Sequence, residues 1–487
     1  MMKHSLKEGR SFKVSEKKCN FTAHKETNRN MFATETYVNR RAALKKSVGS
    51  GIMLFFGNEE CGMNYEDNTY HFKQDSSFLY FFGLDYAGLA ALIDIDEDRE
   101  IIFGNELTID DIVWMGTQPT LHEKAYRVGI KETRPAAELK SYLDKAVSKG
   151  QTIHYLPVYR AEHKIKLQHL LGIYPGTEMP STPFIKGIVN LRNYKTEEEI
   201  VELERACDVT ADMHIEAIRT AQVGMHEYEV AAALEAVAQA NGCRPSFPTI
   251  TTVNGQTLHN HYHGNIIKEG DMLLIDAGAE TEMGYCGDMS STVCAGKAFT
   301  SRQKEIYDIQ VASHLAAVNA LKPGIPFKDV YELSCRVICE GLKGLGIMKG
   351  DPAEAVAAGA HAMFFPCGLG HMMGLDVHDM ENLGEIWVGY DGQPKSTQFG
   401  RKSLRLARPL EPGFVLTIEP GIYFIPELID YWKSENRFTD FICYDKLDSY
   451  RDFTGLRNEE DYLITETGAR RLGKKIPLTT EEVEALR

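Results

Sequence analysis

The stretch MLLIDAGAETEMGYCGDMSSTV, residues 272–293, indicates both the fold and the chemistry of this chain. An apolar run, Met272–Ile275, leads into Asp276, and a second strand-like run follows Asp288 after a polar loop that contains glycine. Two such runs separated by a glycine-containing loop predict a β-hairpin. Buried carboxylates at the ends of its strands cost free energy unless a partner compensates them, and a divalent metal ion is such a partner. Two turn aspartates without any ligand are the plainer interpretation.

Three later motifs favour the metal interpretation. They read GLGHMMGLDVHD at residues 368–379, TIEPGIY at 417–423 and RNEEDYLIT at 457–465. With the hairpin they supply four carboxylates and one imidazole: Asp276, Asp288, His371, Glu419 and Glu459. This oxygen-rich set with a single nitrogen suits Mn, Fe, Co or Zn. Four carboxylates exceed the charge of one dication, so the set predicts two metal ions.

In this order, the motifs resemble the aminopeptidase P and prolidase family of pita-bread metallopeptidases, from about Tyr37 to the C-terminus. The resemblance implies an α+β fold, in which an α/β N-terminal domain precedes a pita-bread catalytic domain. It also implies two divalent metal ions, with Mn(2+) expected ahead of Co, Zn or Fe as the native metal. The implied substrate is a proline-containing peptide or dipeptide that is cut at its N-terminal Xaa-Pro bond. Proline specificity comes from the resemblance alone, since no spacing in the sequence shows it.

The resemblance also assigns roles to single residues. Glu419 is expected to be both a metal ligand and a proton shuttle, and His378 to contact the substrate carbonyl. For the last ligand, the family pattern Arg-x-Glu selects Glu459 over Glu460, and Arg457 joins the expected substrate contacts. Arg405 matches a prolidase residue that binds the free carboxylate of a dipeptide, a task suited to a planar guanidinium. A structural ion pair is the alternative role for Arg405.

A further substrate histidine is expected in LHNHYH, residues 258–263. His259, His261 and His263 alternate, so on a strand they would share one face. A gapless match to the family favours His259, whereas the family's usual His-Tyr pair favours His261. Both therefore stay open, with His259 preferred.

Three features depart from the family pattern. The hairpin loop is one residue longer than usual, which a turn can absorb. Cys367 stands where the family has a substrate-contacting histidine, which puts substrate efficiency in doubt but not metal binding. The segment between Tyr423 and Leu456 is long, as in prolidases.

Length and composition narrow the class of protein. A chain of 487 residues suggests two or three domains. A net charge of −15 argues against nucleic acid and anionic membrane partners. Neither an 18-residue apolar run nor a signal peptide is found, and ten scattered cysteines without a C-x-x-C motif indicate a reduced, cytoplasmic protein. The family resemblance predicts a homodimer or higher homo-oligomer.

Four segments are expected along the chain. Residues 1–33 form a polar, basic and disordered extension, within which Met31 is an alternative start. Residues 34–174 form the aminopeptidase P-type N-terminal domain, and residues 175–190, which open with PGTEMPSTP, form a linker. Residues 191–487 form the catalytic domain.

Local patterns predict the elements within these domains. Helices are expected at 37–49, 136–148, 226–241, 302–321 and 330–345, and a long one after the capping box Thr196–Glu199. Strands are expected at 51–57, 75–83, 89–94, 100–103 and 151–156. From Phe364 onward we expect short strands and loops that carry the motifs.

Other functional classes fit this sequence less well. A methionine-type aminopeptidase shares the catalytic fold, but the N-terminal domain and Arg405 argue against it. A peptidase-like binding module and a metal-free creatinase-like hydrolase lose ligands in their families, whereas this chain keeps all five.

Overall fold

The computed structural model describes residues 31–487 of the chain. The predicted disordered extension lies almost wholly outside these residues, and α1 begins three residues after Met31, at Thr34. Among the described helices, none combines the length and the apolar character that crossing a membrane requires.

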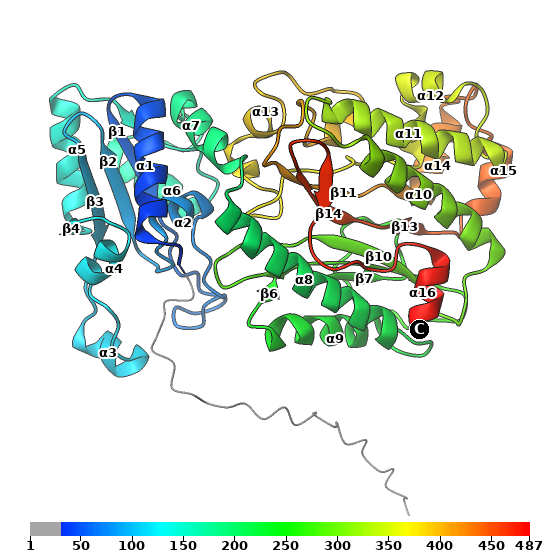
Figure 1. The fold of residues 1–487 in the computed structure, drawn as a ribbon, viewed down its shortest axis with the longest axis horizontal. Helices are drawn as coiled ribbons and strands as arrows, with labels where there is room; N and C mark the ends of the chain where they lie inside the picture. The colour runs from blue at the N-terminus through cyan, green and yellow to red at the C-terminus, as the bar shows by residue number, and fades with distance from the viewer. Residues whose placement is uncertain (1–30) are drawn as a thin grey trace, which may run out of the picture. The chain divides into compact units, whose positions relative to one another are not determined.

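A five-stranded mixed sheet forms the core of the N-terminal domain (Figure 1). Its strand order is β4-β3-β2-β1-β5, in which β2 is antiparallel to both β1 and β3, β4 is parallel to β3 and β5 is parallel to β1. The strands are β1 Ile52–Phe56, β2 Ala90–Asp94, β3 Arg99–Gly104, β4 Glu132–Pro135 and β5 Ile153–His154. The helices are α1 Thr34–Val48, α2 Ser76–Phe82, α3 Ile109–Met115, α4 Leu121–Arg127, α5 Glu138–Ser148, α6 Ala161–Leu171 and α7 Thr182–Arg192.

The apolar core of this domain joins the sheet to α5 and α6. Leu54 and Leu92 from the sheet are buried together with Leu143 of α5 and Leu167 of α6. Helices packed on a sheet in this way confirm the predicted α/β architecture.

Long helices frame the catalytic domain. The first, α8, begins at the predicted capping box, where the Thr196 hydroxyl accepts a hydrogen bond from the Glu199 amide and the Glu199 carboxylate accepts one from the Thr196 amide. Two free amides of the first turn are satisfied in this way. The helices are α8 Glu197–Thr220, α9 Glu227–Ala240, α10 Ser301–Ala320, α11 Phe327–Gly344, α12 Pro352–Ala358, α13 Glu385–Val388, α14 Pro426–Ser434, α15 Tyr444–Leu447 and α16 Thr480–Leu486.

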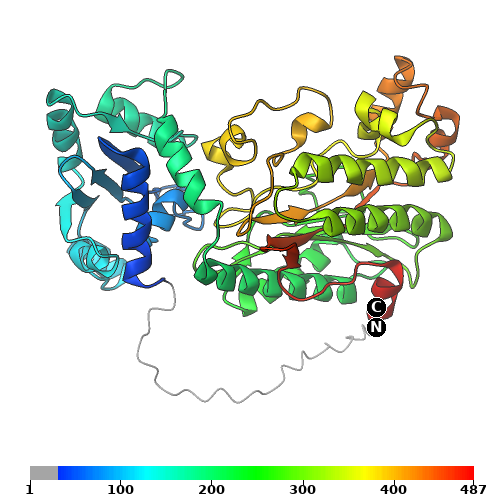
Figure 2. The same ribbon diagram turned by 45° about the horizontal axis from the view of Figure 1, so that its top comes forward.

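Short, mostly antiparallel strands lie between these helices. They pair as β10-β8-β7, β11-β14-β15, β12-β13 and β6-β9. Helices α8 and α9 cover one side of the strands and α10 and α11 the other (Figures 1 and 2). The strands are β6 Arg244–Pro245, β7 Ile250–Thr252, β8 Met272–Ala277, β9 Ala279–Glu280, β10 Met289–Cys294, β11 Val415–Ile418, β12 Gly421–Tyr423, β13 Gly455–Arg457, β14 Glu460–Ile464 and β15 Ala469–Arg471.

Two predictions of local structure were wrong. The segment 75–83 is helix α2, because Asp75 caps its N-terminus by accepting from the Phe78 amide at 2.8 Å, and Gly83 ends it at a φ of 60°. A short apolar run does not by itself distinguish a strand from a buried helix. Helix α7 begins within the predicted linker, with Pro183 in its first turn, and continues to Arg192, so residues 182–190 of that segment are helical.

The second wrong prediction concerns the C-terminal part, which contains helices as well as strands and loops. Pro426 opens α14, and a capping box formed by Thr479 and Glu482 opens α16. Both starting signals are present in the sequence. Part of the long segment after Tyr423 is therefore helical.

Candidate active site

The predicted hairpin brings two carboxylates to one place. Strands β8 and β10 pair antiparallel with Asp276 opposite Ser290, and Asp288 directly precedes β10. Gly278 lets the chain cross closely here, because a Cβ at this position would lie 1.9 Å from the Gly287 carbonyl oxygen. The prediction of a hairpin is confirmed.

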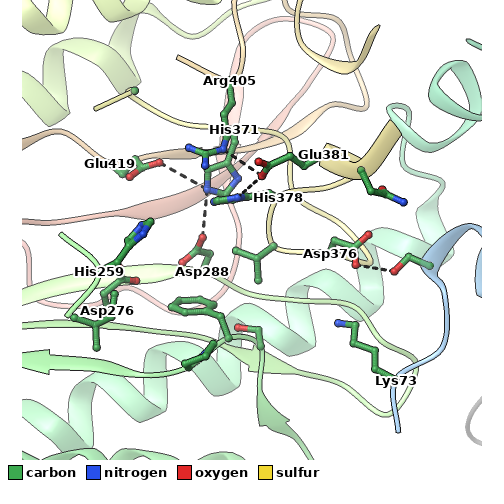
Figure 3. Close-up of a pocket in the computed structure, with 18 of the residues that line it drawn as sticks. Lys73, His259, Asp276, Asp288, His371, Asp376, His378, Glu381, Arg405 and Glu419 are labelled. Atoms are coloured by element: carbon green, nitrogen blue, oxygen red, sulfur yellow. Dashed lines mark hydrogen bonds and ion pairs between the residues drawn. The ribbon is translucent and has the colours of Figure 1, made fainter. Parts of the chain in front are cut away.

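His371 joins Asp288 and Glu459 at the centre of the site. Ligand atoms of these three buried residues lie within 4.8 Å of one another. His371 Nε2 is 3.4 Å from Asp288 Oδ2 and 3.7 Å from Glu419 Oε1 (Figure 3). His371 Nδ1 lies 3.1 Å from the Met372 carbonyl oxygen. A proton on Nδ1 donated to that carbonyl leaves Nε2 free to bind a metal.

A glycine next to His371 allows this segment to approach a strand. A Cβ on Gly370 would lie 2.0 Å from the carbonyl oxygen of Thr417 in β11. The Thr417 amide donates to the His371 carbonyl at 3.1 Å, which fixes the segment against the strand. The glycine next to His371 thus permits the close approach of this segment to β11.

Arg457 provides the positive charge closest to the carboxylates. Its guanidinium forms a buried ion pair with Asp276 and donates to the Tyr423 hydroxyl at 2.7 Å and to Ser290 Oγ at 2.9 Å. Ser290 Oγ in turn donates to Glu459 Oε2 at 2.7 Å. Arg457 borders the cavity described below and also positions two candidate ligands.

One arginine does not compensate this much negative charge. Burial, followed by the charge of Asp276, raises the pKa of Asp288 to about 7. Burial also raises the pKa of Glu419 to about 7. Burial, followed by the charges of Asp288 and Glu419, raises the pKa of Glu459 well above its usual range. Clustered carboxylates with one free imidazole nitrogen therefore fit divalent cations, which would ionise them.

Glu460, the neighbour of Glu459, points into a different environment. Its carboxylate lies 3.2 Å from His314 Nε2 and accepts from Tyr462 Oη at 2.7 Å and from Arg471 at 3.0 Å. Burial opposes the ionisation of Glu460, but these contacts outweigh it and lower its pKa to about 2. Glu460 is therefore already compensated within the protein.

The carboxylates border a cavity of about 540 Å³ (Figure 3). All the candidate substrate contacts line it, namely His259, His261, His378, Arg405 and Arg457. Cys367 lines it too, and burial raises the pKa of its thiol to about 12.

The three alternating histidines do not share a strand face, because residues 259–263 form an irregular loop. His263 Nε2 instead lies 3.0 Å from the Thr249 carbonyl oxygen. Only His259 and His261 of the three border the cavity. Both His259 and His261 therefore remain candidates for the substrate contact.

Sequence reasoning missed Glu381. Its Oε2 lies 2.6 Å from His378 Nδ1 and 3.3 Å from Arg405 Nε, so one carboxylate holds two candidate substrate contacts. The bond from His378 is the main reason that the pKa of Glu381 is lowered to about 2. Glu381 follows His378 by three residues, and this spacing is the signal in the sequence that could have predicted their contact.

Asp461 and one wall of the cavity were also missed. Asp461 Oδ2 accepts a hydrogen bond from the Asp288 amide at 3.0 Å and so supports the hairpin end. The N-terminal domain supplies part of the cavity lining: Asn58, Lys73, Gln74, Asp75, Ser76, Tyr159 and Arg160. These residues come from separate segments, so no local pattern could have grouped them.

Known proteins share this architecture over nearly the whole chain. A model described as metallopeptidase family M24 matches residues 201–466, and one described as aminopeptidase P, N-terminal domain, matches residues 37–154. The Xaa-Pro dipeptidase of Homo sapiens is 31% identical over 89% of this chain and 88% of its own length. The Xaa-Pro aminopeptidase of Escherichia coli (strain K12) is 30% identical over 93% of this chain and 97% of its own.

Solved structures give the same result. Proline aminopeptidase P II from Yersinia pestis is 27% identical with a TM-score of 0.78, covering 93% of this chain and 99% of that one. Aminopeptidase P from E. coli with the inhibitor Pro-Leu is 28% identical with a TM-score of 0.77, covering 94% and 98%. The resemblance and the pita-bread fold predicted from the sequence are confirmed. This chain belongs to metallopeptidase family M24, whose members use divalent metal, and it carries the N-terminal domain of the aminopeptidases P.

Proposed function

We propose that this protein is a metal-dependent exopeptidase that hydrolyses the Xaa-Pro bond at the N-terminus of peptides or dipeptides. The observation that carries the proposal is the cluster of Asp288, His371 and Glu459, with Asp276 and Glu419 beside it, on the wall of a 540 Å³ cavity. A cavity of this volume is in the range of small-ligand sites. Relatives that match along most of the chain are named Xaa-Pro dipeptidase and Xaa-Pro aminopeptidase.

We infer that the site holds two divalent ions, with Mn(2+) the best match and Co, Zn or Fe compatible with the same donors. The ligands would be Asp276, Asp288, His371, Glu419 and Glu459. When bound, such ions supply a nucleophilic water at neutral pH and polarise the scissile carbonyl. The outward contacts of Glu460 with His314 and Arg471 support Glu459 as the fifth ligand.

The surrounding residues would handle the proton and orient the substrate. Glu419 borders the cavity beside His371, and its carboxylate is placed to take a proton from water and give it to the leaving nitrogen. His378 is placed to donate a hydrogen bond to the substrate carbonyl oxygen, and Glu381 holds its Nδ1. His259, with His261 as the alternative, would contact the bound peptide from the loop opposite.

Arg405 is the candidate for recognising the end of a dipeptide. It borders the cavity and stays within reach of Glu381 and Glu385 at 3.3 and 3.5 Å. A substrate carboxylate would replace part of that charge pairing and receive a bidentate bond. Arg405 therefore favours a dipeptidase over an aminopeptidase.

We also propose a homo-oligomer and a cytoplasmic location. Helix α3 buries none of its residues, and its exposed fractions reach 72% at Ile109, 74% at Val113 and 86% at Trp114. Large apolar side chains exposed together favour a protein contact. The nine cysteines of the described residues are free thiols, as is usual in a reducing compartment.

A chelation experiment tests the enzyme proposal. Protein stripped of metal should hydrolyse no Ala-Pro, and added Mn²⁺ or Co²⁺ should restore hydrolysis, with two ions bound per chain by elemental analysis. Tight peptide binding without hydrolysis in the metal-loaded protein would instead favour a peptidase-like binding module. Full activity in the stripped protein would refute a metal-dependent reaction.

A further inference from the structure

The cavity has a second end, formed by the N-terminal domain and the segment around Asp376. In the view of Figure 3, Lys73 and Asp376 lie across the pocket from His259 and Glu419. Ser76 Oγ donates to Asp376 Oδ1 at 2.6 Å, which joins the N-terminal domain to the catalytic domain at this end. A substrate held at the carboxylate cluster can therefore extend toward groups that the catalytic domain alone does not provide.

Most charges at this end are compensated within the protein. Lys73 pairs with Glu280 at 2.8 Å, and Arg160 pairs with Glu162. Asp376 is paired with Arg192 at 3.2 Å in addition to its bond from Ser76. These pairs contribute little net charge to an entering ligand.

Asp75 is different. Its carboxylate accepts the capping bond from the Phe78 amide at 2.8 Å and forms no ion pair with any residue in the range 31–487. Burial, together with the charge of Asp376, raises the pKa of Asp75 to about 6. The charge of Arg192 offsets this shift only in part, because that guanidinium is already paired with Asp376 and Asp379, so above that pH Asp75 is a half-buried carboxylate on the cavity wall without an ion-pair partner of its own.

Asn58 provides a second acceptor without a donor. It is 3% exposed and borders the cavity, and its Oδ1 has no hydrogen-bond partner in the described part of the chain. Its Nδ2 donates to the Lys73 carbonyl at 2.8 Å, which fixes the orientation of the amide. The backbone amides of Asn58 and Asp75 both donate to Gln74 Oε1, at 2.7 and 3.0 Å, so the two residues are neighbours.

We propose that this end of the cavity, with Asp75 as its charged group and Asn58 beside it, binds the cationic side chain of the substrate's first residue, preferably arginine. A guanidinium carries five N–H donors in a planar fork, enough to serve both acceptors. The inference rests on the proposed Xaa-Pro hydrolysis, because it assumes that the scissile carbonyl sits at the carboxylate cluster.

The substrate's terminal ammonium is the other cation to consider. It is two bonds, or about 2.5 Å, from the scissile carbonyl carbon, so it stays beside the carboxylate cluster. An arginine side chain instead extends several bonds away from the scissile carbonyl into the cavity that both ends share. The side chain is therefore the cation that fits Asp75.

The test compares Arg-Pro with citrulline-Pro, its uncharged isostere, on the Mn²⁺-loaded full-length protein at pH 8. Both peptides carry the same terminal ammonium, so the ratio of their kcat/KM values isolates the side-chain charge. We expect a ratio of about ten in the wild type, since a hydrogen bond to a charged group is worth that much. In Asp75→Asn, which keeps the helix cap, the ratio should fall close to one.

Two control variants test whether the change in the kcat/KM ratio is specific to Asp75. Glu59→Gln removes a carboxylate of the same domain that pairs with Lys166 and does not border the cavity, so the ratio should stay at its wild-type value. Lys73→Met removes a cation from the same end, so the ratio should stay at or above that value. A wild-type ratio near one, or an Asp75→Asn variant that loses both peptides equally, would overturn the inference. Wild-type protein that hydrolyses neither peptide, nor the tripeptide that extends each of them by alanine, would refute the proposed function itself.

Discussion

The two walls of the cavity differ in how their charges are compensated. On the catalytic wall, Asp288, Glu419 and Glu459 all have raised pKa values, and Arg457 is the buried cation beside them. On the N-terminal wall, Lys73 and Arg160 already have partners, and Asp75 is the exception. The first wall needs cations from outside the chain, whereas the second is nearly neutral. Changes to the first should therefore abolish activity, and changes to the second should alter substrate preference.

The largest expected effect on activity comes from replacing Glu459 by glutamine, with the same replacement at Glu460 as its control. Glu459→Gln should lose bound metal and reduce kcat/KM by more than about a hundred-fold, because losing even an outer-shell partner of a metal ligand costs ten- to a hundred-fold. Glu460→Gln should keep both properties, since its carboxylate contacts His314 and Arg471. Metal analysis and an Ala-Pro assay on the two variants measure this. An inactive Glu460→Gln beside an active Glu459→Gln would show that the wrong glutamate was assigned as the ligand.

A second effect should appear in the pH dependence of the stability of the metal-free protein. The folded-state pKa values of Asp288 and Glu419, both about 7, lie above the ordinary values of 3.8 and 4.5. The folded protein thus binds protons more tightly than the unfolded chain does. Protonation of these two carboxylates therefore stabilises the folded state fully below their ordinary pKa values, and this contribution is lost as the pH rises through 7. The free energy of unfolding of metal-stripped protein should therefore fall by about a few kcal/mol between pH 5 and 8, because each unit of pKa difference between the folded and unfolded states contributes about 1.4 kcal/mol.

Urea denaturation of chelator-treated protein at several pH values measures this fall. Mn²⁺ at pH 8 should restore the stability, because it binds the folded state. Asp288→Asn should flatten the dependence on pH. A stripped wild type with equal stability at pH 5 and pH 8 would contradict the assignment of uncompensated charge to this wall.

His378→Ala should reduce kcat/KM on Ala-Pro by about a hundred-fold with unchanged metal content, the range for loss of one positioned donor. The reason is that His378 borders the cavity and bonds to Glu381 at 2.6 Å. Glu381→Gln should have a smaller effect, since it only orients the imidazole. Loss of metal from His378→Ala in proportion to activity would make His378 a ligand.

How much of this was available from the sequence differs between the two walls. The hairpin and the long helices of the catalytic domain follow from local patterns of apolar residues, glycines and capping residues. The grouping of Asp288 with His371 and Glu459 follows from the family resemblance, since local patterns do not select Glu459 over Glu460. The assignment of Asp75 to a strand was wrong, because the capping role of that residue was not recognised. The N-terminal wall could not be predicted, since Asn58, Asp75 and Arg160 meet only through tertiary packing.

Arg405→Ala is expected to reduce kcat/KM for a dipeptide by about ten-fold and to leave its tripeptide extension nearly unchanged. The reason is geometric, because a tripeptide moves the terminal carboxylate one residue beyond the guanidinium, and a charge-assisted bond is worth about that factor. Ala-Pro and Ala-Pro-Ala, assayed on wild type and variant, measure this. Equal losses on both substrates would favour an aminopeptidase, in which Arg405 stabilises Glu381 and Glu385 alone.

The smallest effect should come from the contact that joins the two walls. Ser76→Ala removes the donor to Asp376 but leaves Asp376 paired with Arg192, so the wall keeps its charge balance. One neutral donor to a partly exposed carboxylate is worth about 1 kcal/mol, so we expect a change of about five-fold. The change should appear in KM rather than kcat, because no group at the carboxylate cluster is altered. Steady-state kinetics on Ala-Pro measure both constants, with Ser141→Ala, an exposed helix position in the same domain, as the matched control. A fall in kcat of ten-fold or more in Ser76→Ala would mean that closure of the N-terminal wall controls the catalytic cluster, and the separation between a catalytic wall and a specificity wall would then not hold.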